Sequence, residues 1–200
     1  MKLKTACLTV LLVLLAGVVQ AASLDAIVEN CNGCHGDDGV SQWTDVPTIA
    51  GIDAFVHSEA LYIYREDGRP CGESKYRQGD TARPATTMCA IASKLDDETI
   101  EALAAYYSKF PFVAAKQSFD PELAAAGKIV HNRDCARCHS DGGSNPDDEA
   151  SILAGQWMDY LRITFTQYAA GEREQPDKMK EKIDSLGQAD VEALLHYYAS

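Results

Sequence analysis

Apolar residues recur at helical spacing in several segments of the chain, and no segment has the alternating pattern of a strand. Ile100, Leu103, Ala104 and Tyr107 predict a helix that begins near Asp96, and a similar pattern predicts one from about residue 188 to the chain end. Middle helices are expected over residues 54–66 and 156–170. Loops rich in Gly and Asp separate these segments, so the sequence predicts an all-α fold.

Two further helices are expected to lead into a cysteine pair each. One begins at about Leu24 and runs into "CNGCH", residues 31–35. The other begins at "SFDPEL", where Asp120 suits the N-cap and Pro121 the first helical position, and runs to Cys135 in "CARCH".

The two halves of the chain form an internal repeat. Cys31 and Cys135 are 104 positions apart, and so are "IAG" at 49–51 and "LAG" at 153–155. The terminal helices, "EALAAYYS" at 101–108 and "EALLHYYA" at 192–199, are only 91 positions apart. The first half therefore contains an insertion of thirteen residues, which the pattern places between Cys71 and Arg83. The tyrosine pairs that end both helices are interpreted as packing residues.

The N-terminal segment reads as a secretory signal peptide. Lys2 and Lys4 precede an apolar run that is too short to span a membrane comfortably, and small residues follow it at 19–23. We therefore expect a signal peptide at 1–22, a first domain at 23–108, a linker at 109–119 and a second domain at 120–200. The expected location is the periplasm, with no membrane span in the mature form.

The chain is acidic, with a formal net charge of −12. Cleavage after residue 21 removes two lysines and no acid, so the mature charge becomes −14. Such a surface disfavours nucleic acid as a partner and favours a protein with a basic patch, although solubility alone also accounts for it. No paired catalytic carboxylates and no nucleotide or flavin fingerprint are present, so no catalytic residue is assigned.

The two CxxCH motifs carry the strongest chemical signal. Two thiols one turn apart can add to the two vinyl groups of a haem, and the next residue, His35 or His139, then lies under the iron. A redox dithiol needs no histidine at that position, and a four-cysteine zinc site needs both pairs to converge. Cys31, Cys34, Cys135 and Cys138 are therefore predicted to bind two covalently attached haem c groups.

Met88 and Met179 are the candidates for the second axial ligands. They are 91 positions apart, as are the terminal helices that they precede, and methionine opposite histidine raises the reduction potential of a haem. The alternative is that both are ordinary core residues. Met158 has no counterpart in the first half and is interpreted as core. His57, His131 and His196 also lack counterparts and are interpreted as surface or satisfied structural residues.

Cys71 and Cys89 remain after four thiols are assigned to haem. In an oxidising compartment the expected outcome is an intrachain disulfide that closes the insertion beside Met88. Two free thiols, or a bond to a partner chain, are the alternatives.

With these motifs in each half, the chain resembles the dihaem class I cytochromes c, whose fold is two tandem domains, each wrapped around one haem. The run "AAKQSFDPELAAAGKIVHNRDCARCHSDGG", followed by "ILAGQW" and "KMKEKI", is also similar to the cytochrome subunits of flavocytochrome c sulfide dehydrogenases. The likeness is dense over 114–183 and looser in the first half. It departs at the insertion and at Ser151, which stands where the first half has Pro47.

This resemblance implies that the chain is an electron-transfer subunit and not an enzyme by itself. It implies a heterodimer with a flavin-containing subunit that oxidises sulfide, and a soluble cytochrome c as the acceptor. It also implies axial ligation by His35, Met88, His139 and Met179. The alternative is a freestanding periplasmic dihaem carrier that delivers electrons to a terminal oxidase.

Overall fold

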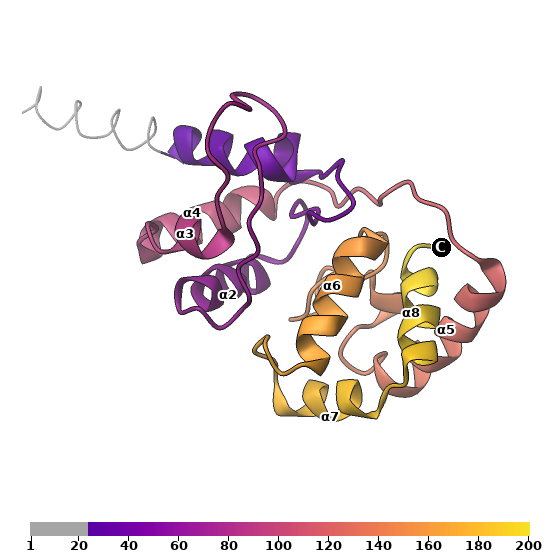
Figure 1. The fold of residues 1–200 in the computed structure, drawn as a ribbon. Helices are drawn as coiled ribbons and strands as arrows, with labels where there is room; N and C mark the ends of the chain where they lie inside the picture. Colours follow the sequence, from indigo (N-terminus) through magenta and orange to yellow (C-terminus); the bar gives the residue numbers. More distant parts are fainter. Residues whose placement is uncertain (1–23) are drawn as a thin grey trace, which may run out of the picture.

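The computed structural model describes residues 24–200, and the predicted signal peptide lies outside these residues. Two helical lobes follow one another along the chain (Figure 1). The first contains a helix over residues 24–35, η1 (Asp37–Gly39), α2 (Ala54–Arg65), α3 (Met88–Ala92) and α4 (Asp97–Tyr107). The second contains α5 (Pro121–Asp134), η2 (Asp141–Gly143), α6 (Met158–Ala169), α7 (Asp177–Ser185) and α8 (Gln188–Tyr198).

The helices follow from local sequence signals and mostly agree with the predictions. Asp120 caps α5 by accepting hydrogen bonds from the backbone N–H groups of Glu122 and Leu123, with Pro121 in the first turn. Asp96 caps α4 in the same manner. The short helix α3 and the helix α7 were not predicted. The two candidate methionines precede the terminal helices as expected, and they lie on these two additional helices. Within residues 24–200 the only β-type pairing is an isolated bridge between Ser74 and Thr86.

Each lobe has its own hydrophobic core, built where its first and last helices meet its middle helix. In the first lobe the core consists of Val28, Leu61, Leu95, Ile100, Leu103 and Tyr107. In the second it consists of Val130, Leu161, Leu194, Leu195 and Tyr198. The helices α5 and α8 pack closely at Gly127, where a Cβ would overlap the backbone of Ala193. Among the described residues, no helix is both long and apolar enough to cross a membrane.

The sequence repeat is also a repeat of hydrogen bonds. The carbonyl of Gly39 accepts from the backbone N–H groups of Ile49 and Ala50, and that of Gly143 accepts from residues 153 and 154 in the same way. Gly51 N–H donates to the carbonyl of Tyr107, and Gly155 N–H donates to that of Tyr198. The "IAG" and "LAG" segments therefore connect the loop after each CxxCH motif to the end of the terminal helix.

The same two glycines let the connecting segment pass close to both lobes. Gly51 and Gly155 have φ angles of 70° and 80°, which L residues with side chains rarely adopt. A Cβ on Gly51 would overlap the backbone of Phe112, and one on Gly155 would meet Ala114. No helix is assigned between the end of α4 and the start of α5, and this extended segment crosses between the lobes in Figure 1.

The lobes contact each other through the N-terminal end of α6. The amide of Gln156 pairs with the backbone of Thr48 as another strand would, donating to its carbonyl (2.6 Å) and accepting from its N–H (3.1 Å). Trp157 Nε1–H donates to the carbonyl of Ser41 (3.1 Å). Because Gln156 and Thr48 are buried, these bonds are shielded from water and fix the register of the two lobes.

The insertion packs on the first CxxCH helix. Tyr76 is buried, and its hydroxyl donates to Asn30 Oδ1 (2.8 Å). The backbone N–H of Arg77 donates to the carbonyl of Gly33, and the Arg77 guanidinium forms a two-point ion pair with Asp45. The extra residues of the first half are thus an ordered cover beside Cys34, whose Sγ lies 3.6 Å from the Lys75 carbonyl oxygen.

Candidate functional site

The first CxxCH motif forms the last turn of the helix over residues 24–35. Cys31 and Cys34 are half-buried thiols that are bonded to no other cysteine. Burial raises the pKa of Cys31 to about 11, although a hydrogen bond with Tyr107 opposes the rise. Cys31 packs against the core of its lobe, whereas Cys34 lies under the insertion.

The second motif has a different local form. Helix α5 ends at Asp134, and residues 135–139 form successive turns in which the N–H groups of Cys138 and His139 both donate to the carbonyl of Cys135. Cys135 packs against the second core, and Cys138 is exposed. Within residues 24–200 no cluster of three or more potential metal-ligating side chains is present, so the two cysteine pairs do not converge on one site.

Both motif histidines are held by the same contact. His35 Nδ1 donates to the carbonyl of Pro47 (3.0 Å), and His139 Nδ1 donates to the carbonyl of Ser151 (3.2 Å). Burial lowers the pKa of each imidazole, although the carbonyl opposes this effect. A neutral imidazole with a proton on Nδ1 presents the lone pair of Nε2, which is the form that binds a metal. Because the acceptor is a backbone carbonyl, the change from proline to serine leaves the contact intact.

These residues fit a covalently attached haem. Each lobe offers two unbonded thiols and, directly after them, an imidazole whose second nitrogen is free to coordinate iron. The buried tyrosine at the end of each terminal helix lies beside the first thiol of its motif. Tyr107 donates to Asn32 Oδ1 (2.8 Å), and the Tyr198 hydroxyl bonds His131 Nδ1 (3.0 Å).

The two candidate methionines are placed differently. Met88 is the first residue of α3 and packs against the same core as Cys31. Met179 is half-buried in the first turns of α7, and it is not among the residues that pack against the second core. Met158 does pack against that core, as expected of a structural residue. The structure thus brings Met88, but not Met179, to the core that borders its CxxCH motif.

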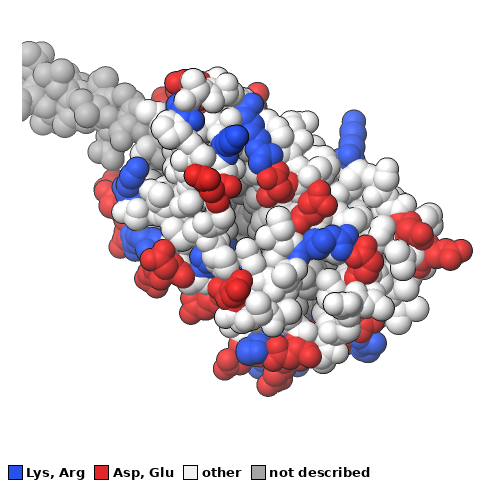
Figure 2. Space-filling view, in the orientation of Figure 1, with Lys and Arg blue, Asp and Glu red and all other residues white. Residues whose placement is uncertain are grey.

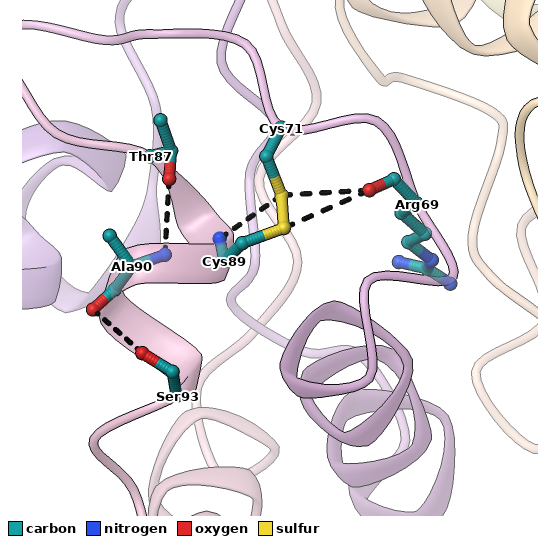
Figure 3. The surroundings of a disulfide bond; sticks show 6 residues. All are labelled: Arg69, Cys71, Thr87, Cys89, Ala90 and Ser93. Atoms are coloured by element: carbon teal, nitrogen blue, oxygen red, sulfur yellow. Dashed lines mark hydrogen bonds between the residues drawn. A yellow bond between two sulfur atoms is a disulfide. The ribbon is translucent and has the colours of Figure 1, made fainter.

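Cys71 and Cys89 form a disulfide in the structure, with their Cα atoms 5.8 Å apart. Cys89 directly follows Met88, and its N–H donates to Cys71 Sγ (3.1 Å). Figure 3 shows the bridge between the N-terminus of α3 and the segment that follows α2, with the carbonyl oxygen of Arg69 beside both sulfurs. The bridge therefore joins the Met88 helix to the end of the middle helix.

The expectation that the remaining histidines are surface or satisfied structural residues is wrong for His57. His57 is buried, lies against the ring of Tyr107 at a centroid distance of 5.6 Å, and has no hydrogen-bond partner on either nitrogen. His131 is fully buried and has a partner on one nitrogen only. His196 matches the expectation, because it accepts from Asp120 N–H and lies 3.3 Å from Glu192. The sequence repeat gave no sign of His57 because its counterpart is a leucine.

Known proteins resemble the chain in both sequence and fold. The cytochrome c family model matches residues 24–109. Cytochrome c-554(548) of Halomonas halodenitrificans is 30% identical over 89 residues, which cover 44% of this chain and 94% of that protein. The thiosulfate dehydrogenase electron acceptor of Stutzerimonas stutzeri is 28% identical over 182 residues, covering 85% of this chain and 78% of that one. The crystal structure of reduced cytochrome c4 from Pseudomonas stutzeri superimposes with a TM-score of 0.70 at 25% identity, covering 90% and 97% of the two chains.

Proposed function

This chain belongs to the cytochrome c family, and we propose that it is the cytochrome subunit of a flavocytochrome c sulfide dehydrogenase. It is a dihaem c-type electron carrier of two all-helical domains. In the proposed complex a flavin-containing subunit oxidises sulfide, and this chain passes the electrons singly to a soluble cytochrome c. The proposed location is the periplasm after removal of residues 1–22, with domains at 23–108 and 120–200 and a linker between them.

One observation carries the assignment of the sites: the histidine of each CxxCH motif donates Nδ1–H to a carbonyl twelve residues further along the chain. This contact fixes the ring and its tautomer, so Nε2 is directed to a ligand. We assign covalent attachment to Cys31, Cys34, Cys135 and Cys138, and axial ligation to His35, Met88, His139 and Met179. When bound, each haem supplies a one-electron redox centre.

The disulfide supports a specific role for the insertion. Thr87 caps α3 by accepting from the N–H of Ala90 (3.0 Å), and the bridge from Cys89 to Cys71 fixes the same turn from the other side. Met88 lies between these two restraints. In the proposal, the disulfide holds the long first-half loop so that Met88 stays on its haem.

The partner assignment rests on the dense likeness over residues 114–183 and on surface charge. Figure 2 shows acidic side chains spread over both lobes, with lysines and arginines between them. Such a surface is complementary to a partner with a basic docking face. A flavoprotein subunit and a soluble cytochrome c then occupy different parts of the surface, one near each haem.

A second donor is favoured by one finding, the similarity to the thiosulfate dehydrogenase electron acceptor. In that reading the chain accepts electrons from a thiosulfate-oxidising enzyme rather than from a sulfide-oxidising flavoprotein. The third possibility is a freestanding carrier that serves a terminal oxidase.

The deciding experiment is purification of the native protein under mild conditions. Copurification of a flavin-containing chain, with haem reduction by sulfide and not by thiosulfate, supports the sulfide dehydrogenase assignment. Haem reduction by thiosulfate in a complex without flavin supports the second donor. A stable lone chain that is reduced by neither compound, but is oxidised by a terminal oxidase, overturns both. The pyridine haemochrome of the same sample measures haem content, and two haems per chain are expected.

A further inference from the structure

Two arginines occupy equivalent positions in the two lobes. Arg69 and Arg173 are 104 positions apart, the offset that relates the CxxCH motifs, and each follows the C-terminal end of a middle helix, α2 or α6. The Arg69 guanidinium lies over the ring of Tyr64 (5.1 Å to the centroid), and that of Arg173 lies over Tyr168 (5.2 Å). Tyr64 and Tyr168 are themselves 104 positions apart. The lobes thus repeat an arginine and tyrosine pair as they repeat the haem-binding motif.

These two pairs meet where the lobes touch. The N–H of Glu174 donates to the carbonyl of Gly68 (2.9 Å), a backbone contact between residues that adjoin the two arginines. Arg173 Nη2 lies 3.5 Å from the Tyr160 hydroxyl. Burial by itself would raise the pKa of Tyr160, but the charges of Arg173 and Arg69 lower it below its ordinary value. Tyr160 therefore lies in direct contact with Arg173 and within the electrostatic reach of Arg69.

The positive charges at this boundary have no negative partner in the part of the chain that the structure describes. Arg173 is only 6% exposed, and the Nε atoms of both arginines are buried without a hydrogen-bond partner. Glu174 is directed to Gly68 and forms no ion pair with either arginine. The one polar side-chain contact of Arg173 besides tyrosine is to Gln167 Oε1 (3.2 Å). A buried guanidinium N–H without a partner is costly, and each of the two arginines has one, so a carboxylate acceptor at this boundary would remove that cost.

We propose that Arg69 and Arg173 bind the propionate carboxylates of the two haems, each arginine serving the haem of its own lobe. This inference rests on the two-haem part of the proposed function. The repeat favours propionate over a single bound anion, since one arginine per CxxCH motif matches one carboxylate-bearing edge per haem. Arginine also suits the task, because its fork of donors pairs with a carboxylate at two points and includes the Nε–H.

The disulfide adds to this arrangement in the first lobe only. The Arg69 carbonyl oxygen lies 3.5 Å and 3.8 Å from the two bridge sulfurs (Figure 3). The bridge therefore holds the segment that carries Arg69 as well as the helix that begins with Met88. The second lobe has no such bridge at Arg173, where burial and the contacts with Gln167, Tyr160 and Tyr168 hold the side chain.

Proton NMR of the reduced, diamagnetic two-haem protein, with its arginines labelled with nitrogen-15, tests the contact directly and needs no variant. The expected result is two exchange-protected Nε–H signals, each with a nuclear Overhauser effect to a propionate methylene group. Absence of both effects overturns the proposal. Signals that move when inorganic phosphate is added or removed would identify a small exchangeable anion instead, and would overturn it equally.

Reduction potentials give an independent readout. A cation held beside a haem favours the ferrous state, so Arg69→Gln and Arg173→Gln are each expected to lower the midpoint potential of one haem, with Arg→Lys variants nearer to wild type. The matched control is Arg65→Gln, because Arg65 also lies over a tyrosine ring (Tyr62, 5.0 Å) but has its own carboxylate partner, Asp97. Unchanged potentials in both Gln variants, or an equal shift in the control, refute the proposal.

The two proposals fail separately. A wild-type chain with fewer than two haems by pyridine haemochrome contradicts the proposed function. A two-haem chain without the predicted arginine contacts contradicts only this inference.

Discussion

Removal of the Cys71–Cys89 bridge by the double substitution Cys71→Ser/Cys89→Ser tests the role of the insertion. The two cysteines are 18 positions apart, and cross-linking a loop of this length stabilises a protein by about 3 kcal/mol, chiefly through the unfolded chain. In a domain of this size that loss corresponds to a fall of roughly 15 °C in the melting temperature. The Tyr76 and Arg77 contacts hold the loop in the folded state, so the native arrangement is expected to persist.

Two measurements on the holoprotein separate stability from ligation. Denaturant unfolding followed by circular dichroism gives the change in free energy of the first domain, while the second domain acts as an internal reference. The ferric spectrum reports the Met88 bond to iron through its charge-transfer band. We expect both stability and the occupancy of that bond to fall. Full retention of the methionine band would refute the anchoring role and leave general stabilisation, and unchanged unfolding would refute the loop-closure argument itself.

The remaining predictions concern the ligands, a tight turn and an ion pair. Met88→Ala and Met179→Ala are each expected to convert one haem from low-spin to high-spin in the ferric spectrum, and a variant that stays low-spin excludes that methionine as a ligand. Gly51→Ala is expected to cost at least about 1 kcal/mol in unfolding experiments, because the residue has a positive φ and a Cβ would overlap the linker; a neutral result contradicts this packing. The hydrogen bond from Arg77 holds the pKa of Asp45 below its ordinary value, so the pair stabilises the protein above that ordinary pKa and is lost as pH falls through the lowered one. Since both groups are partly exposed, Asp45→Asn is expected to lower stability by less than about 1 kcal/mol at neutral pH and to have no effect in acid, as thermal melts at both pH values will show.

Much of the fold could be predicted from the sequence because the local helix signals and the internal repeat agreed with each other. Caps such as Asp96 and Asp120 determine where helices begin, and the apolar spacing determines the face that they bury. The helix α3 was missed because five residues are too few for a periodic pattern to stand out, and α7 because six of its nine residues are charged. Their formation depends on tertiary packing rather than on propensity.

Part of the candidate site was likewise predicted from the sequence, and part was visible only in the structure. The attachment cysteines and their histidines are adjacent in the chain, so spacing alone pointed to them. The hydrogen bonds from His35 and His139 join residues twelve positions apart through backbone carbonyls, and a carbonyl leaves no trace in the residue type. Arg69 and Arg173 are present in the sequence at the repeat offset. Only the structure, through buried Nε atoms and the lack of a carboxylate partner, indicated that they bind an anion.

The sequence by itself determined the chemistry of this protein, because covalent haem attachment needs two thiols and a histidine at one fixed local spacing. It also determined the helical repeat, since both halves carry the same local signals in the same order. Only the tertiary structure decided which side chains are buried without partners, how Gln156 and Trp157 join the lobes, and that the carbonyl of Arg69 lies beside the disulfide. These features depend on residues distant in the chain coming together in a water-excluded interior, and no local pattern records that.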